Sequence, residues 1–184
     1  MQGSVFQNPF AADSSLGRAN SVNPVVQLHG TGCGIASVAA IVGLSYKESL
    51  VAAESLGIFP HDRALWTETS HVRALLDRFG AKTPLREIPF SSWEGLPDLA
   101  LLAIKWHLEK GIPSWHWVVF AREAGRAIVL DPKKGLPSNV RTDFWRMRPK
   151  WYIPVILDQI PGRNPPSDRT SSLDEKGNLH RREH

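Results

Sequence analysis

The stretch from Cys33 to Val42 is apolar on nearly every side, and it constrains the fold more than any other part of the chain. A helix without a polar face has to be buried in the middle of a domain rather than lie on its surface. Gly43 gives this helix a natural end. We therefore expect a buried central helix, with the single cysteine of the 184-residue chain at its start.

Signals for two further helices follow the central one. Ser45 and Glu48 have the spacing of a capping box, which predicts a second helix that ends at Gly57. A third helix begins at a cap formed by Thr69 or Ser70. Its apolar residues fall on one stripe, namely Val72, Leu75, Leu76 and Phe79. The first half of the chain is therefore expected to be helical.

The second half of the chain has the patterns of strands. We expect a buried strand over 99–106, two strands joined by a short turn over 115–121 and 127–131, and a last strand over 151–157. Pro154 lies inside the last strand and removes a backbone donor, so we expect that strand at an edge of the sheet. Helices followed by an antiparallel sheet make an α+β fold.

The two ends of the chain differ in composition from its middle. Residues 1–24 are rich in Ser, Asn, Gly and Ala, which indicates an irregular N-terminal arm. Residues 161–184 contain almost no large apolar side chain, which predicts a disordered tail. One domain over residues 25–160 lies between them, and a hydrophobic content of 42% supplies enough apolar material for its core.

Charge and cysteine content restrict the partners and the compartment. The net charge of +4 is spread along the chain without a dense basic block, so we expect no nucleic-acid partner. One cysteine cannot form an internal disulfide, and the N-terminus has no secretory signal pattern. No apolar run is long enough to span a bilayer. We expect a soluble protein that is cytoplasmic as made and has no membrane partner; export by a signal-independent route stays open.

The cysteine at the start of the central helix is a candidate nucleophile. A thiol attacks as the thiolate, which the positive end of a helix dipole and a nearby imidazolium both favour. The small residues Gly32 and Gly34 leave space for a substrate on either side of Cys33. From this context alone, a catalytic cysteine and a small buried structural cysteine are equally supported.

His116 is the best candidate for a base, and its strand brings a carboxylate near it. Side chains alternate along a strand, so His116 shares a face with Val118. A turn centred on 123–124 pairs His116 with Asp131, whereas a turn centred on 124–125 pairs Asp131 with Val118. In both registers the carboxylate can hold one tautomer of the imidazole and favour the imidazolium.

Other residues complete this set or compete with it. Gln27 can donate its side-chain amide to an oxyanion, together with the backbone N–H of Cys33. Asn139 and Asp143 rank second to Asp131 as the third member, because they lie in a less regular stretch. Candidate metal ligands are scattered rather than paired, namely His29, Cys33, His61, Asp62, His71 and His107. We therefore expect no metal site and no cofactor.

The order of these motifs resembles a known family. Gln27, six residues before a cysteine that opens a buried helix, looks like the papain-like cysteine peptidases. The segments 32–36, 116–119 and 129–132 resemble more closely the bacteriocin-leader-processing, double-glycine peptidase-like branch. The resemblance covers roughly residues 25–157. One departure is the glycine before the cysteine, where that branch usually has aspartate.

The resemblance implies a papain-like α+β fold, in which a helical N-terminal half with a buried central helix packs on a C-terminal antiparallel sheet. It also implies a role for each of four residues: Cys33 as nucleophile, His116 as general base and acid, Asp131 as orienting group, and Gln27 as oxyanion donor beside the Cys33 N–H. We expect the substrate cleft to be lined by Gly32, Trp115 and Trp117.

Three functions are compatible with these residues. The first is a cysteine hydrolase that cleaves a peptide or isopeptide bond in a peptide or protein substrate. The second is an acyl transferase or a glutamine deamidase with the same triad. The third, ranked well below, is a non-catalytic papain-like binding module with Trp115 and Trp117 as its partner-binding patch. A small stand-alone peptidase also suggests a bacterial effector or toxin with an inhibitory partner protein, or a small processing enzyme.

Overall fold

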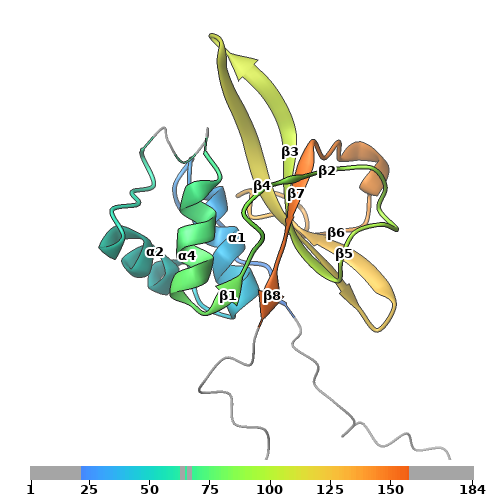
Figure 1. The fold of residues 1–184 in the computed structure, drawn as a ribbon, viewed down its shortest axis with the longest axis horizontal. Helices are drawn as coiled ribbons and strands as arrows, with labels where there is room; N and C mark the ends of the chain where they lie inside the picture. The colour runs from blue at the N-terminus through green and yellow to red at the C-terminus, as the bar shows by residue number, and fades with distance from the viewer. Residues whose placement is uncertain (1–21, 63–64, 66–67, 158–184) are drawn as a thin grey trace, which may run out of the picture.

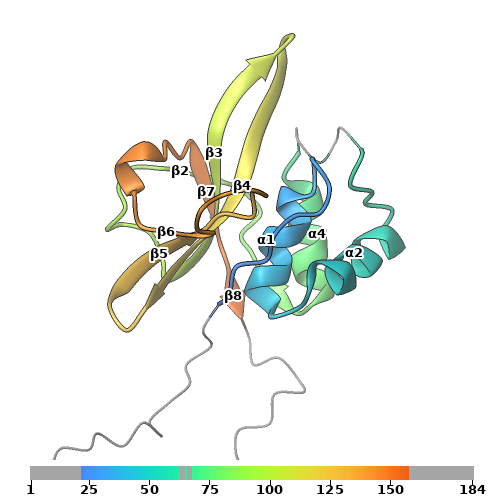
Figure 2. The same cartoon turned by 180° about the vertical axis from the view of Figure 1, so that it is seen from behind.

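The computed structural model describes residues 22–62, 65 and 68–157, which form a helical half packed beside a sheet half (Figures 1 and 2). The described helices are α1 (Cys33–Val42), α2 (Tyr46–Ser55), α4 (Ser70–Arg78) and the short 3-10 helix η1 (Phe144–Arg146). The main sheet is antiparallel and has the strand order β2 (Ile88–Pro89), β7 (Trp151–Pro154), β3 (Leu99–Glu109), β4 (Ile112–Glu123), β5 (Arg126–Leu130) and β6 (Val140–Arg141). A separate pair is formed by β1 (Ala81–Lys82) and β8 (Ile156–Leu157). The predicted α+β fold is confirmed.

α1 is the buried helix that the sequence predicts. Every one of its residues except Val42 is buried, and the helix packs against α2, α4 and β4. Gly34 allows this close approach, since a Cβ there would lie 2.9 Å from Val72 of α4 and 3.4 Å from Trp117 of β4. Gly43 ends the helix in the left-handed conformation, at a φ of 74°.

The other helices begin where the sequence signals place them. The hydroxyl of Ser45 accepts a hydrogen bond from the Glu48 N–H, and the Glu48 carboxylate accepts one from the Ser45 N–H at 2.8 Å. This completes the predicted capping box of α2. α4 follows Thr69, whose hydroxyl donates to Glu87 instead of capping the helix.

β3 and β4 are longer than the sequence predicts. β3 continues to Glu109 and β4 begins at Ile112, and together they form a hairpin that projects from the sheet (Figure 1). Its outer residues, 105–113, are exposed on both faces, so they carry no alternation of buried and exposed positions. An irregularity between Ile104 and His107, with Lys105 at a φ of 56°, also interrupts the pairing where the exposed part begins.

The segment 151–157 divides into β7 and β8, which belong to different sheets. β7 lies between β2 and β3, so the prediction of an edge strand is wrong for its first part. β2 pairs with Trp151 and Tyr152, whereas Pro154 pairs with Ala100 of β3. Pro154 therefore lies beyond the part that β2 covers, where the missing N–H of proline breaks no bond to β2.

The main sheet separates two hydrophobic clusters. Trp115, Trp117 and Val119 of β4 belong to the cluster that packs on the helices. Val118 and Phe120 belong to the cluster on the opposite face. The predicted arm, apart from residues 22–24, and the predicted tail lie outside the described residues. Within the described part, no single helix is long and apolar enough to cross a membrane; α1 and α2 pass that test only as a pair bent by 112°.

Candidate active site

The β4–β5 hairpin resolves the register that the sequence leaves open. Its turn falls on Ala124 and Gly125, which have φ values of 47° and 77°. Two central residues with positive φ are characteristic of the type I′ turn of tight hairpins. The pairing of β4 with β5 ends at Val119 and Leu130, one residue before Asp131, in the register that leads Asp131 toward Val118 rather than toward a position opposite His116. The second of the two registers is therefore present.

His116 and Asp131 are in direct contact. His116 Nε2 lies 2.8 Å from Asp131 Oδ1, and the two side chains are 16% and 0% exposed. The same oxygen accepts a hydrogen bond from the Lys133 N–H at 3.0 Å. The other oxygen, Oδ2, accepts one from Arg141 Nη1 at 2.8 Å. The Asp131 carboxylate is thus fixed by donors on both of its oxygens.

For both His116 and Asp131, the contacts with neighbouring groups shift the pKa further than burial shifts it in the opposite direction. Burial lowers the pKa of His116, but the hydrogen bond to Asp131 and the interaction with the Cys33 side chain raise that pKa to about 9. Burial raises the pKa of Asp131, but the hydrogen bond to His116 and its charge, with Lys133 and Arg141, hold that pKa well below its usual range. At neutral pH the two groups are an imidazolium and a carboxylate.

Cys33 is the first residue of α1 and is 5% exposed. The N–H groups of a first helical turn have no partner inside the helix, and Gly32 at the N-cap provides no side-chain acceptor for them. Because His116 Nε2 faces Asp131, Nδ1 is the nitrogen that remains for Cys33. The fold therefore brings the thiol, the imidazole and the carboxylate into one cluster.

Gln27 lies beside this cluster, but its amide is already engaged. Gln27 Nε2 donates to the carbonyl oxygens of His29 and Gly30, both at 2.8 Å. The backbone N–H of Gln27 donates to the Pro132 carbonyl at 2.9 Å and so ties this loop to the segment after Asp131. To bind an oxyanion, the side chain has to release one of the two loop carbonyls, so its oxyanion role stays a prediction.

Tyr46 of α2 is a residue of this region that the sequence did not indicate. A Cβ on Gly32 would lie 2.0 Å from the Tyr46 hydroxyl oxygen, so the ring fills the space that a side chain at position 32 needs. Gly32 is buried here rather than open to a cleft. His29, which had no predicted role in the reaction, places Nδ1 3.1 Å from the same hydroxyl. Burial raises the pKa of Tyr46 to about 12, so the phenol stays protonated at neutral pH.

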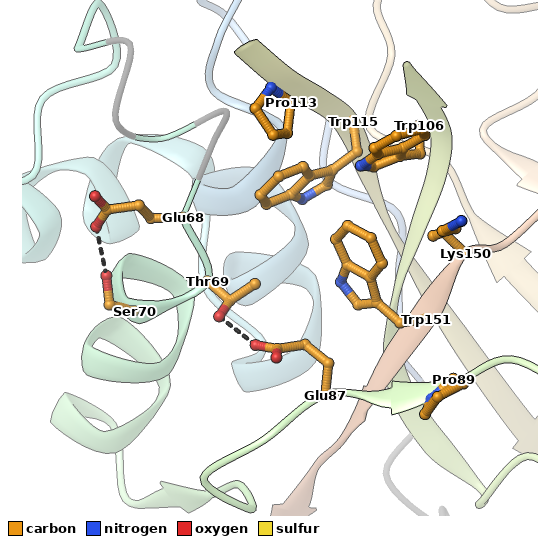
Figure 3. Close-up of a pocket in the computed structure, with 10 residues that line it drawn as sticks. All are labelled: Glu68, Thr69, Ser70, Glu87, Pro89, Trp106, Pro113, Trp115, Lys150 and Trp151. Atoms are coloured by element: carbon orange, nitrogen blue, oxygen red, sulfur yellow. Dashed lines mark hydrogen bonds between the residues drawn. The ribbon is translucent and has the colours of Figure 1, made fainter. Parts of the chain in front are cut away.

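The two tryptophans next to His116 have different surroundings. Trp117 is fully buried under α1, in the core rather than in a cleft. Trp115 is 7% exposed and lines a cavity of about 700 Å³ between the start of α4, β2 and the base of the β3–β4 hairpin (Figure 3). Of this pair, only Trp115 can meet a ligand, and the two do not form a shared surface patch.

Asn139 and Asp143, the alternative candidates for the third member, help to hold Asp131 in place. Asn139 Nδ2 donates to the backbone carbonyl of Asp131 at 2.6 Å. Asp143 accepts from Arg141 at 2.9 Å, and Arg141 in turn holds Asp131. Arg141 was not indicated by the sequence, because its two-residue strand has no clear pattern. Among the residues that the structure describes, no group of three or more His, Cys, Asp or Glu side chains could hold a metal ion.

Comparison with known proteins identifies no family for this chain. No protein-family model matches it, and no curated protein matches it well enough to count as a relative. The site itself consists of three groups that the fold brings together, a thiol, an imidazole and a carboxylate.

Proposed function

We propose that the chain is a papain-like cysteine hydrolase that cleaves a peptide or isopeptide bond. The observation that carries the proposal is the 2.8 Å contact between His116 Nε2 and the fully buried Asp131, which leaves Nδ1 for a cysteine at the start of a buried helix. A purely structural histidine requires neither a charged partner nor a thiol on its other nitrogen. Nucleophile, base and orienting group follow the logic of a catalytic triad.

The proposed reaction starts from an imidazolium and a thiolate. Cys33 lies beside the cation of His116 and at the N-terminal end of α1, the two surroundings in which cysteine nucleophiles are generally found. Sγ attacks the carbonyl carbon, and the scissile C–N bond breaks as His116 donates its Nδ1 proton to the leaving nitrogen. The neutral imidazole then takes a proton from water, the water oxygen attacks the thioester, and the thiolate leaves. Asp131 remains charged throughout.

Negative charge that develops on the substrate oxygen needs donors. The N–H groups of the first turn of α1, beginning with Cys33, are placed to provide them. Gln27 becomes a further donor if one of its hydrogen bonds to the loop carbonyls of His29 and Gly30 is exchanged for the oxyanion.

Alkylation by iodoacetamide tests the nucleophile without knowledge of the substrate. At pH 7 we expect Cys33 to react much faster than free cysteine, and His116→Ala to slow the reaction by at least about tenfold, because the imidazolium that favours the thiolate is lost. His107→Ala is the matched control, since His107 is exposed on the β3–β4 hairpin. Equal rates for the wild type, both variants and free cysteine would refute the proposal.

A further inference from the structure

A chain of alternating charges extends from the proposed catalytic residues to the edge of the main sheet. Asp131 contacts His116 through Oδ1 and Arg141 through Oδ2, each at 2.8 Å. Asp143 binds the far side of the Arg141 guanidinium. Arg141 lies on β6, the two-residue strand that follows β5 at the end of the sheet (Figure 1). The outermost strand thus reaches the His116–Asp131 pair through one side chain.

The guanidinium of Arg141 is fixed from outside the proposed triad. Asp143 accepts hydrogen bonds from its Nε and its Nη2, both at 2.9 Å, and such a two-point contact sets the plane of the group. Nη1 is the atom that reaches Asp131, and the Arg141 side chain is 17% exposed. The position of Nη1 is therefore set by Asp143 and by the pairing of β6 with β5, and not by Asp131 alone.

Asp131 depends on this contact for its orientation. Its Oδ1 accepts from His116 and from the Lys133 N–H, whereas Arg141 is the one donor to Oδ2 among the described residues. A carboxylate that is bound at both oxygens cannot rotate about its Cβ–Cγ bond without breaking hydrogen bonds. Because Asp131 is 0% exposed, solvent does not readily replace a lost donor, and the carboxylate would turn to share those that remain.

The orientation of Asp131 matters for His116 because their contact is a directed hydrogen bond. That bond raises the pKa of His116 more than the negative charge of Asp131 does. A hydrogen bond weakens steeply as its angle departs from linear, whereas the attraction between two charges depends mainly on their distance. The other ionisable groups around the pair are Cys33 of α1 and, beyond the carboxylate, Arg141 with Asp143.

We propose that Arg141 is a positioning residue for the proposed reaction: it holds Oδ2 of Asp131 so that Oδ1 stays directed at His116. The imidazole then keeps Nδ1 toward Cys33. Asp143 supports this role because it fixes the guanidinium. The inference rests on the proposed function for the statement that the oriented imidazole serves a reaction.

The alternative role for Arg141 is that of a counter-ion, which only neutralises a buried carboxylate. The two roles predict opposite changes at His116 when Arg141 is removed. Loss of a nearby cation raises the pKa of an imidazole, whereas loss of its hydrogen bond to a carboxylate lowers that pKa. The direction of the change therefore distinguishes positioning from neutralisation.

The pKa of His116 is measured by NMR on the full chain with ¹³C-labelled histidine, and His116→Gln assigns the resonance. For Arg141→Met we expect this pKa to fall from about 9 by at least about one pH unit. Arg146→Met is the matched control, because Arg146 also approaches Asp143, at 3.9 Å, but is 64% exposed. It changes the pKa of His116 by less than about 0.2. An unchanged or raised pKa in Arg141→Met overturns the proposal.

Arg141→Lys decides the matter if the methionine variant does not fold. Lysine keeps a cation beside the buried carboxylate, but its ammonium cannot be fixed in a plane by Asp143 as the guanidinium is. We expect the pKa of His116 to fall in this variant too, by at least about half a pH unit. A pKa equal to that of the wild type contradicts the positioning role.

Alkylation of Cys33 by iodoacetamide at pH 7 connects the positioning to the reaction. We expect Arg141→Met to slow it by at least about threefold, because a turned imidazole lies less often beside the thiol, and Arg146→Met to leave it unchanged. An ordinary thiol rate in the wild type rejects the proposed function and with it a role of Arg141 in a reaction. A fast thiol together with an unchanged pKa of His116 in both Arg141 variants rejects the positioning role alone.

Discussion

A glycine precedes Cys33 because Tyr46 fills the space beside it. The Tyr46 hydroxyl also lies 3.1 Å from His29 Nδ1, so the loop before the proposed nucleophile contacts α2 at both His29 and Gly32. The aspartate that is usual in the leader-processing branch does not fit at position 32 without displacement of this ring. The position of the proposed nucleophile thus depends on a helix that contributes no member of the proposed triad.

Gly32→Ala tests this attachment. The new Cβ forces the Tyr46 ring or the loop to move, so we expect a loss of about 1–3 kcal/mol in the free energy of unfolding, measured with urea, and slower alkylation of Cys33. Gly30→Ala is the control, because a Cβ at Gly30 meets nothing within 4 Å. Addition of Tyr46→Phe to Gly32→Ala recovers part of the loss; strictly additive effects would contradict the contact.

Arg141→Met tests the support of Asp131. Arg141 binds Oδ2 of a carboxylate that is 0% exposed, and its removal leaves that oxygen without a cation. We expect the free energy of unfolding to fall by about 2–4 kcal/mol. Arg126→Met, an exposed arginine on β5, changes it by less than about 0.5 kcal/mol. Similar losses in both variants would show that Arg141 does not stabilise the pair.

Among the elements, the β4–β5 turn sets the register of the hairpin and so determines which residues of β4 and β5 lie opposite each other. Ala124 has a φ of 47°, a conformation that alanine adopts at a cost and that asparagine tolerates better. Ala124→Asn is therefore expected to raise the free energy of unfolding by about 0.5–1 kcal/mol in urea titrations. Gly125→Ala, at a φ of 77°, is expected to lower it. A destabilising Ala124→Asn would contradict the type I′ assignment.

Ser45→Ala tests the capping box of α2. It removes the acceptor for the Glu48 N–H, so we expect a loss of about 1 kcal/mol in the free energy of unfolding. Ser55→Ala, which alters an exposed serine in the last turn of the same helix, serves as the control and changes it by less than about 0.5 kcal/mol. An equal loss in both variants would argue against the cap.

The elements that the sequence predicts are those with strong local signals. α1 has a wholly apolar run, α2 has a capping box, and the core of β4 has alternating residues. β1, β2 and β6 are two residues long and exist only because a partner strand passes beside them, so no local pattern indicates them. The outer part of the β3–β4 hairpin is exposed on both faces and was missed for the same reason.

At the scale of the whole molecule, the charges of His116 and Asp131 connect stability to pH. The pKa of His116 rises from 6.5 to about 9 on folding, so its contribution to stability is complete below pH 6.5 and is lost as the pH rises through 9. The pKa of Asp131 falls on folding, so its contribution is present above pH 3.8 and is lost in acid. The pair therefore contributes most to the stability of the fold between pH 3.8 and pH 6.5.

His116→Gln provides the measurement of this linkage. The variant lacks the titrating group, so the difference in unfolding free energy between wild type and variant shrinks as the pH rises from 6.5 past 9. The change amounts to at most about 3 kcal/mol and is measured by urea titration at each pH. Parallel pH profiles for the two proteins would contradict a raised pKa of His116.

The contact between His116 and Asp131 could be predicted from the sequence, because it follows from the alternation of side chains along a strand. Both registers of the hairpin placed Asp131 on the face of His116, and the structure contains one of them. The contacts of Tyr46 with Gly32 and of Arg141 with Asp131 depend on how α2 and β6 pack, and no spacing in the sequence encodes such packing. The engaged amide of Gln27 likewise follows from the path of its loop.

The cluster joins positions 33, 116 and 131, so it exists only after α1 has docked on the β4–β5 hairpin. Contacts between residues so far apart in the chain are made late, because long loops have to close first. Under the proposed function, Cys33 has ordinary thiol reactivity in an unfolded or half-folded chain and gains its reactivity at docking. Pulsed alkylation during refolding would therefore time the docking step, and the same thiol would distinguish nascent chains from finished ones.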